Sequence, residues 1–197
     1  DPFLLDEEME AAFAICRQRG YKVAAHATTR EAVKAAIRLG AHSIEHGYAM
    51  DEECIDLFVE HGTWYVPTLA ISHLTPDSAT TEQEKAWLER RKLPPETVHS
   101  AQDAAPEHGR WFKRALDAGV KMALGSDRQP LHETTLLEMG QWIKAGASPR
   151  QTLLAATRNA AELCGVGDQL GTVEPGKLAD LIVVGGDPLA DIEALRD

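Results

Sequence analysis

Residues 20–46 read GYKVAAHATTREAVKAAIRLGAHSIEH and contain one strand–helix–strand unit. One β-prone run ends at His26 and a second ends at His46. Between them, Thr28 and Glu31 have the spacing of a capping box, and apolar residues then recur at helical spacing. No hairpin signal joins the two runs, so we expect parallel strands linked by a right-handed helical crossover.

The same unit recurs along the chain. Each helical pattern ends in glycine, and a short β-prone run follows it and closes on a polar residue. The glycines and the runs that follow them are Gly20 with 21–26, Gly40 with 42–46, Gly62 with 63–68 and Gly119 with 120–127. Asp51 and Ser148 are expected N-caps of later helices. Helices that alternate with parallel strands predict an α/β fold.

Two segments depart from this repeat. Residues 70–105 are rich in Thr, Ser, Pro and charged residues. An insertion of this length in a compact fold is usually functional or mobile, and one interpretation is a lid over a site. Residues 166–197 carry β-prone runs at 170–173 and 179–184 around a turn at 174–177, which predicts a small β segment.

The composition is that of a globular protein, and it excludes several classes of partner. The 197 residues include 31 acidic and 20 basic residues, for a formal net charge of -11. Nucleic acids and anionic membrane surfaces bind basic patches, so we expect neither as a partner. No apolar run approaches the roughly 20 residues that cross a bilayer. Cys16, Cys54 and Cys164 are widely spaced, and we expect buried, reduced thiols.

Three polar residues, His26, His46 and Asp127, occupy equivalent places at the carboxyl ends of the expected strands. Side chains at these ends converge on one rim of a barrel or open sheet, where ligands bind. Two imidazoles and a carboxylate suit a divalent transition metal such as zinc. A structural interpretation also exists, because strand-end histidines are often simply hydrogen bonded and an aspartate before Arg128 can cap a turn. Spacing alone leaves both interpretations open.

Other polar residues near these strand ends have separate interpretations. His132 follows Asp127 closely, and we expect it to contact a substrate, orient a ligand or cap the next helix. Glu45 directly precedes His46, so strand alternation predicts that Glu45 faces the surrounding helices. His42 lies at the other end of that strand, where a structural role is expected. The histidines that we expect to be exposed are His61, His73, His99 and His108.

Five motifs, in this order, resemble the amidohydrolase superfamily. VAAHA at 23–27, SIEHG at 43–47 and LGSD at 124–127 are similar to its strands 5, 6 and 8, and NAAEL at 159–163 and LGTVEPGKLADL at 170–181 to its C-terminal signature. The similarity covers the chain apart from the insertion. It is greatest to the imidazolonepropionase-like and prolidase-like branch, in which Ile-Glu-His-Gly is common.

The resemblance implies an α/β fold that is the second half of a (β/α)8 barrel, strands 5–8, followed by a C-terminal piece of a small β-sandwich. Residues 1–165 would form the partial barrel, with the insertion at 70–105, and residues 166–197 the β segment of the small domain. The family's His-x-His of strand 1 and lysine of strand 4 are absent from the sequence. The length also falls short of the roughly 250 residues of a bare barrel. The chain therefore looks like a C-terminal fragment, which we expect to be inactive alone.

Carried over residue by residue, the resemblance implies a metal site. His26 and His46 would bind one or two divalent metal ions, with zinc the expected metal. Asp127 would bind metal as well and would act as the catalytic general base toward the attacking water. His132 would contact the substrate or orient a ligand. The implied activity of the intact parent protein is metal-dependent hydrolysis of an amide- or peptide-type C–N bond.

The implied substrate is a small molecule, either an acyl amino acid, a dipeptide or a cyclic amide. Thr28 stands where prolidase-like members often carry tyrosine, so substrate contacts there differ from the family pattern. The alternatives are a deaminase or cyclic-amide hydrolase of the same superfamily and, from another class, a non-catalytic α/β binding or assembly module. A homo-oligomer stays open. We expect a cytoplasmic protein, with a signal peptide upstream of Asp1 as the alternative, because the sequence begins without Met.

Overall fold

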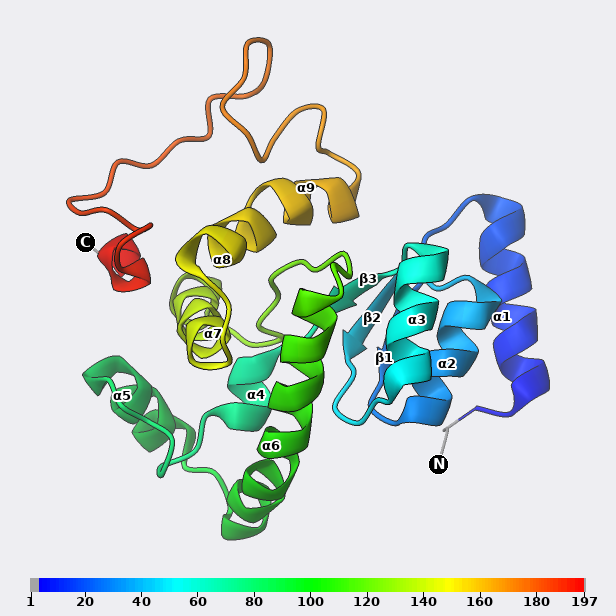
Figure 1. The fold of residues 1–197 in the computed structure, drawn as a ribbon, viewed down its shortest axis with the longest axis horizontal. Coiled ribbons are helices and arrows are strands. Elements are labelled where there is room, and N and C mark those ends of the chain that lie inside the picture. The colour runs from blue at the N-terminus through cyan, green and yellow to red at the C-terminus, as the bar shows by residue number, and fades with distance from the viewer. Residues whose placement is uncertain (1–3, 197) are drawn as a thin grey trace.

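The structure, a computed structural model, describes residues 4–196 (Figure 1). The strands of this part are β1 (Ala24–Ala27), β2 (Ser43–His46) and β3 (Trp64–Val66). The helices are α1 (Asp6–Arg19), α2 (Arg30–Leu39), α3 (Glu52–His61), α4 (Leu69–His73), α5 (Glu82–Arg91), α6 (Pro95–Asp117), α7 (Leu131–Lys144), α8 (Pro149–Ala156) and α9 (Arg158–Cys164), with a final 3-10 helix, Ile192–Arg196. Helices and parallel strands alternate through the first third of the chain.

The three strands form a parallel sheet in the order β1-β2-β3. Ile44 of β2 lies between Ala25 of β1 and Tyr65 of β3 in the ladder. The expected fourth strand within 120–127 is reduced to one parallel bridge between Met122 and Tyr65. The α/β prediction is confirmed, and the sheet of the described residues is smaller than expected.

The helix ends follow the sequence signals closely. The predicted glycines Gly20, Gly40 and Gly62 end the first three helices in the left-handed conformation. Asp51 and Ser148 cap α3 and α8 as expected. The cap of α2 is Thr29, whose hydroxyl accepts from the Ala32 N–H at 3.3 Å, so the capping box predicted from Thr28 is wrong by one residue. Thr29 is extended (φ -108°, ψ 155°), which is the backbone that an N-cap needs.

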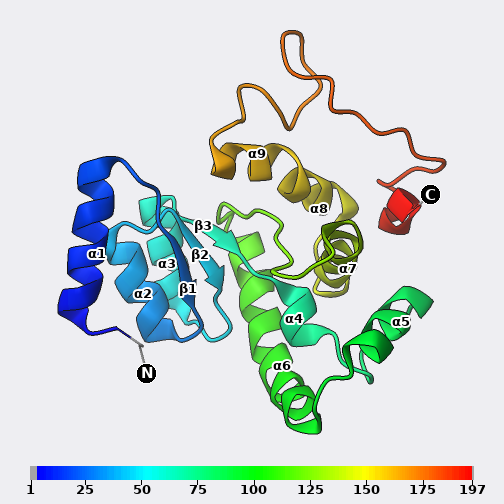
Figure 2. The same ribbon diagram turned by 180° about the vertical axis from the view of Figure 1, so that it is seen from behind.

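Helices α2 and α3 cover one face of the sheet, as both views show (Figures 1 and 2). Ile44 is fully buried in this layer. It belongs to the same hydrophobic core as Val33 and Ile37 of α2 and Cys54 and Phe58 of α3. The core therefore fixes which face of β2 points toward the helices.

Residues 70–105 are mostly helical rather than irregular, and they build α4, α5 and the start of α6. Glu84 in the first turn of α5 is 2% exposed and connects this segment to α7. Its carboxylate accepts from the Thr80 N–H at 2.7 Å, from Lys144 Nζ at 2.6 Å and from Gln141 Nε2 at 2.6 Å. Hydrogen bonds from Lys144 and the backbone lower the pKa of Glu84 even though its burial acts in the opposite direction. The predicted insertion is thus packed against the rest of the chain.

Helix α6 spans 23 residues and contains Pro106 in its interior. Its buried residues are His108, Trp111, Phe112 and Ala115, and its remaining face carries charged side chains. Within residues 4–196, no helix is both long enough and apolar enough to cross a membrane.

The β segment expected after residue 165 does not form in the structure. Residues 166–191 run as turns and irregular chain, and no strand occurs among the described residues there. Val173, Ile182 and Val183 are 83%, 77% and 97% exposed. A β-prone sequence needs a partner strand to satisfy its backbone, and the path in Figure 1 runs beside none. The assignment of 166–197 to a small β domain stays a prediction, and Asp197 lies outside the described residues.

All three cysteines are free thiols. Cys54 is buried, and burial raises the pKa of its thiol to about 12, which makes it unreactive. Cys16 is half-buried and Cys164 is exposed at the end of α9. The expectation of buried thiols is therefore wrong for Cys164.

Candidate functional site

His26 and His46, from the ends of β1 and β2, meet at one edge of the sheet. Their ring centroids lie 4.6 Å apart with an interplanar angle of 68°. His46 is 6% exposed, whereas His26 is exposed. Parallel strands bring their carboxyl ends to the same edge, which explains the convergence. Two of the residues proposed from sequence as metal ligands are thus in contact.

The backbone of His46 turns its ring toward His26. In the ladder, Ala27 lies beside His46, so regular alternation would direct His46 to the helix side with Ile44. Instead, His46 has φ 76°, in the left-handed region. A non-glycine residue in such a conformation costs on the order of 1–3 kcal/mol and persists only where its surroundings hold it.

Glu45 lies on the face opposite to the one predicted from sequence. It pairs with His26 in the ladder and alternates with Ile44, which packs on the helices. The expectation that Glu45 faces the helices is therefore wrong, because it assumed that His46 kept the regular alternation. Ser43 donates a hydrogen bond of 2.6 Å to the Glu45 carboxylate. Burial raises the pKa of Glu45, and the charge of Asp127 raises it further.

Asp127 lies near this edge in a left-handed backbone conformation, with φ 48°. Its charge favours the protonated form of His46 and disfavours the ionised form of Glu45. Gly125 allows the segment to approach β3, since a Cβ at this position would lie only 2.7 Å from Val66 Cγ1. A glycine at this point therefore places Asp127 next to the sheet.

The protonation state of His46 suits metal coordination. Burial lowers the pKa of His46, and the neighbouring His26 and Arg128 lower it further, while Asp127 opposes the change. The imidazole is therefore neutral near pH 7, which is the form that binds metal. Two imidazoles and the Asp127 carboxylate fit zinc by donor chemistry. Within residues 4–196, however, no three His, Cys, Asp or Glu side chains stand close enough together to hold an ion.

A buried network supports the carbonyl side of His46. The Tyr65 hydroxyl donates to the His46 carbonyl at 3.0 Å and lies 3.0 Å from Nε2 of His108. Ser72 Oγ lies 2.8 Å from Nδ1 of His108. His108 is fully buried, so its expected exposure is wrong; burial and the nearby His73 lower its pKa well below the ordinary value. Sequence reasoning missed this residue because its partners lie 36 and 43 positions away.

The ring side of His46 has separate support. Nδ1 of His46 lies 2.7 Å from Thr68 Oγ1. Thr68 leads into α4, whose first two N–H groups donate to the buried carboxylate of Glu138. Burial raises the pKa of Glu138 to about 7, against three N–H donors that favour the charged form. Its place on the buried stripe of α7, next to Leu137 and four residues before Trp142, is the signal that pointed to it.

The other histidines match their expectations in part. His132 is exposed in the first turn of α7, five residues beyond Asp127. His42 Nε2 contacts the Leu163 carbonyl at 3.0 Å, which is a structural role. His61 and His99 are exposed as expected. His73 is half-buried, its Nε2 has no hydrogen-bond partner within the described residues, and burial lowers its pKa to about 4.

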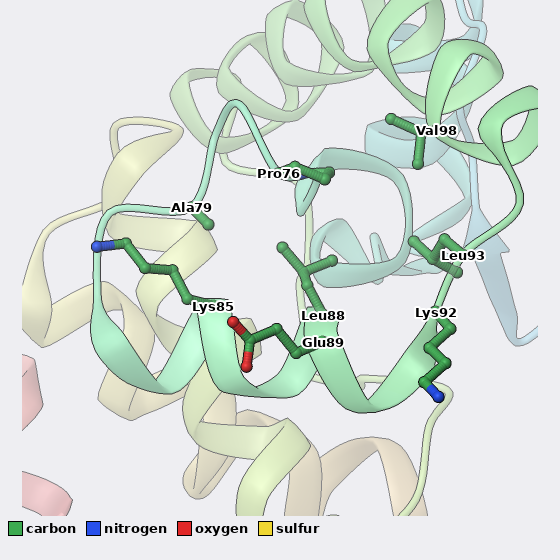
Figure 3. Close-up of a pocket in the computed structure, with 8 residues that line it drawn as sticks. All are labelled: Pro76, Ala79, Lys85, Leu88, Glu89, Lys92, Leu93 and Val98. Atoms are coloured by element: carbon green, nitrogen blue, oxygen red, sulfur yellow. The ribbon is translucent and has the colours of Figure 1, made fainter.

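Two cavities lie beside this region rather than at its centre. One of about 350 Å³ is formed by α5 and its flanking loops, where Leu88 and Leu93 face Pro76 and Val98 (Figure 3). In that view the ammonium ends of its lysines extend away from the apolar side chains. Another, of about 400 Å³, borders the outer edge of β1 between α1 and α2, and His26 is among its lining residues. The β1 edge is thus both apolar and open.

The fold and the strand-end residues define a class: α/β proteins that gather imidazole and carboxylate groups where parallel strands end. A family model described as "Amidohydrolase family" matches residues 2–197. The chain belongs to the amidohydrolase family. The resemblance that the motifs indicated is confirmed, as is its prolidase-like and imidazolonepropionase-like character.

Three relatives show this character. A solved Xaa-Pro dipeptidase with bound methionine in its active site is 35% identical, with a TM-score of 0.82, and the match covers 100% of this chain and 47% of the dipeptidase chain. Ochratoxinase of Aspergillus niger is 29% identical over 193 residues, 97% of this chain and 38% of the ochratoxinase. Imidazolonepropionase of Thermoplasma volcanium is 34% identical over 103 residues, 51% of this chain and 24% of that enzyme. The chain spans less than half the length of these relatives.

Proposed function

We propose that this chain is the second half of a (β/α)8 barrel, strands 5–8, within a metal-dependent hydrolase of amide- or peptide-type C–N bonds. The observation that carries the proposal is the ring contact of His26 and His46 at the end of a parallel sheet. Membership of the amidohydrolase family and similarity to a dipeptidase support the reaction class. The remaining strands and ligands belong to the part of these relatives that the chain does not span.

His26 and His46 would hold a divalent ion, which we propose to be zinc, with Asp127 as a further ligand. Such an ion activates water for nucleophilic attack and polarises the scissile carbonyl when it is bound. Asp127 acts as the general base that accepts a proton from the attacking water and then delivers it to the leaving nitrogen. Its position beside His46 places the carboxylate near both groups that it serves.

The proposed substrates are dipeptides or acyl amino acids. The similarity to a Xaa-Pro dipeptidase favours this choice. His132, which is exposed at the start of α7, is the proposed contact to the substrate. A cyclic-amide hydrolase is the second candidate, favoured by the 34% identity to imidazolonepropionase. A panel of Xaa-Pro dipeptides, acyl amino acids and cyclic amides separates the two by which class is turned over.

Asp127→Asn tests the mechanism in the complete protein that carries this chain. Loss of the general base is expected to lower turnover by roughly 100- to 10,000-fold while bound metal is retained. Asp168→Asn is the matched control, because Asp168 is exposed in the loop after α9. Turnover that survives Asp127→Asn at the level of the control contradicts the assignment.

A further inference from the structure

Thr68 lies between β3 and α4 in a backbone conformation that its side chain disfavours. Its φ is 53°, in the left-handed region, where β-branched residues are rare. The residue is 2% exposed, so the turn is enclosed on all sides. Neighbouring groups must therefore hold Thr68 in this conformation.

The groups that hold the turn come from α7. Glu138 is fully buried, and its two carboxylate oxygens accept from the N–H groups of Leu69 at 2.8 Å and Ala70 at 2.7 Å. The Trp142 indole N–H donates to the same carboxylate at 2.9 Å and fixes its orientation. Leu69 and Ala70 directly follow Thr68, so the carboxylate determines the direction in which the chain leaves this residue.

Thr68 in turn holds the ring of His46. The hydroxyl lies 2.7 Å from Nδ1 of His46. Burial raises the pKa of Tyr48, and a hydrogen bond from Thr68 opposes the rise, which identifies Thr68 as the donor to Tyr48. A hydroxyl that gives its only proton to Tyr48 must accept from His46. The imidazole proton is then on Nδ1, and the lone pair is on Nε2.

We propose that Thr68 and Glu138 are positioning residues for His46: Glu138 fixes the turn at Thr68, and Thr68 fixes the ring and tautomer of His46 so that Nε2 is free to bind a metal ion. This inference rests on the proposed metal site. Neither residue lies on the strands that carry the proposed ligands, and Glu138 is 92 positions from His46 in the sequence. Hydrogen bonds to the other nitrogen of a ligating histidine are the usual means of setting its orientation.

Glu84 provides a matched control for Glu138. It is also a buried carboxylate, 2% exposed, that accepts backbone N–H groups at the start of a helix and contacts α7. Its contacts do not include Thr68 or α4. A variant at Glu84 therefore reports the cost of losing a buried carboxylate without changing the turn that holds His46.

The test is the tautomer of His46 in the metal-free complete protein, measured by ¹⁵N NMR of the imidazole nitrogens. The pH is held near about 8, above the pKa of Glu138, which burial raises to about 7. We expect the wild type, Thr68→Ser and Glu84→Gln to show the Nδ1–H tautomer. Thr68→Val, which keeps the β-branched shape and removes the hydroxyl, should shift His46 toward the Nε2–H tautomer, and Glu138→Gln should do the same without touching His46.

A zinc competition titration gives the second readout. Thr68→Val and Glu138→Gln should weaken zinc binding by roughly 10- to 100-fold, and Thr68→Ser should restore the wild-type affinity. An unchanged tautomer in Thr68→Val overturns the inference, whether or not Glu138→Gln folds. A wild type that holds the Nδ1–H tautomer but binds no zinc contradicts the proposed function while it supports the positioning of His46.

Discussion

His46 shows how single residues shape this site. Its left-handed backbone, φ 76°, turns its ring off the helix-facing side of β2 and against His26. Its carbonyl is held by Tyr65 and its ring by Thr68, each from a different element. The strand pattern predicted where His26 and His46 would meet, because the position of a strand end is a local property. It could not predict the face of Glu45, since that depends on a backbone turn held by distant groups.

Glu138 should make the stability of the protein depend on pH. Its pKa in the folded protein is about 7, against 4.5 for an ordinary glutamate, so the folded state binds the proton more tightly than the unfolded state. Stability from this group is therefore full below about pH 4.5 and falls as the pH rises toward 7, by up to roughly 3 kcal/mol. Urea unfolding across this range should show the fall in wild type relative to Glu138→Gln. A difference between the two proteins that does not change with pH contradicts this assignment.

Gly125 should not tolerate a side chain. A Cβ there would lie 2.7 Å from Val66 Cγ1, so Gly125→Ala overpacks the contact between β3 and the segment that carries Asp127. We expect a loss of about 1–3 kcal/mol in the free energy of unfolding. Gly185→Ala is the control, because nothing lies within 4 Å of its Cβ position. Equal stability of the two variants would argue against this close approach.

At the scale of elements, the sequence predicted the helices better than their partners. The glycines that end α1, α2 and α3 were identified correctly, because a left-handed C-terminal residue is a local requirement. The helical order of residues 70–105 and the burial of His108 were not predicted, because both come from packing against α7 and β3. The expected strand after residue 165 did not form, because strand formation depends on a partner that the described residues do not supply.

Helix α5 should depend on Glu84 for its attachment to α7. Glu84→Ala leaves Lys144 and Gln141 without their acceptor and removes the cap of α5, so we expect a loss of about 2–3 kcal/mol. Limited proteolysis should then cut near α5 before the rest of the chain unfolds. Glu82→Ala on the same helix is the control, since Glu82 is exposed and pairs only with Lys85 among the described residues. Protection of α5 that equals the control contradicts this role.

At the scale of the whole molecule, two apolar surfaces are open. β1 is an edge strand beside a cavity of about 400 Å³, and Ile182 and Val183 are 77% and 97% exposed. Exposed edges and β-prone segments favour association between chains. We expect the isolated 197-residue chain to self-associate and the double variant Ile182→Lys/Val183→Lys to do so less, as measured by sedimentation velocity. Leu131→Lys, on an exposed helix position, should not change association; a monomeric wild-type chain contradicts the prediction.

The central claim is that His26 and His46 share a divalent metal ion. The measurement that tests it most directly is the metal content of the complete protein, determined by elemental analysis after purification without added chelator. We predict bound zinc in the wild type and in the control His61→Ala/His99→Ala, whose histidines are exposed. His26→Ala/His46→Ala should lose at least one equivalent. An unchanged metal content in that variant would contradict the account.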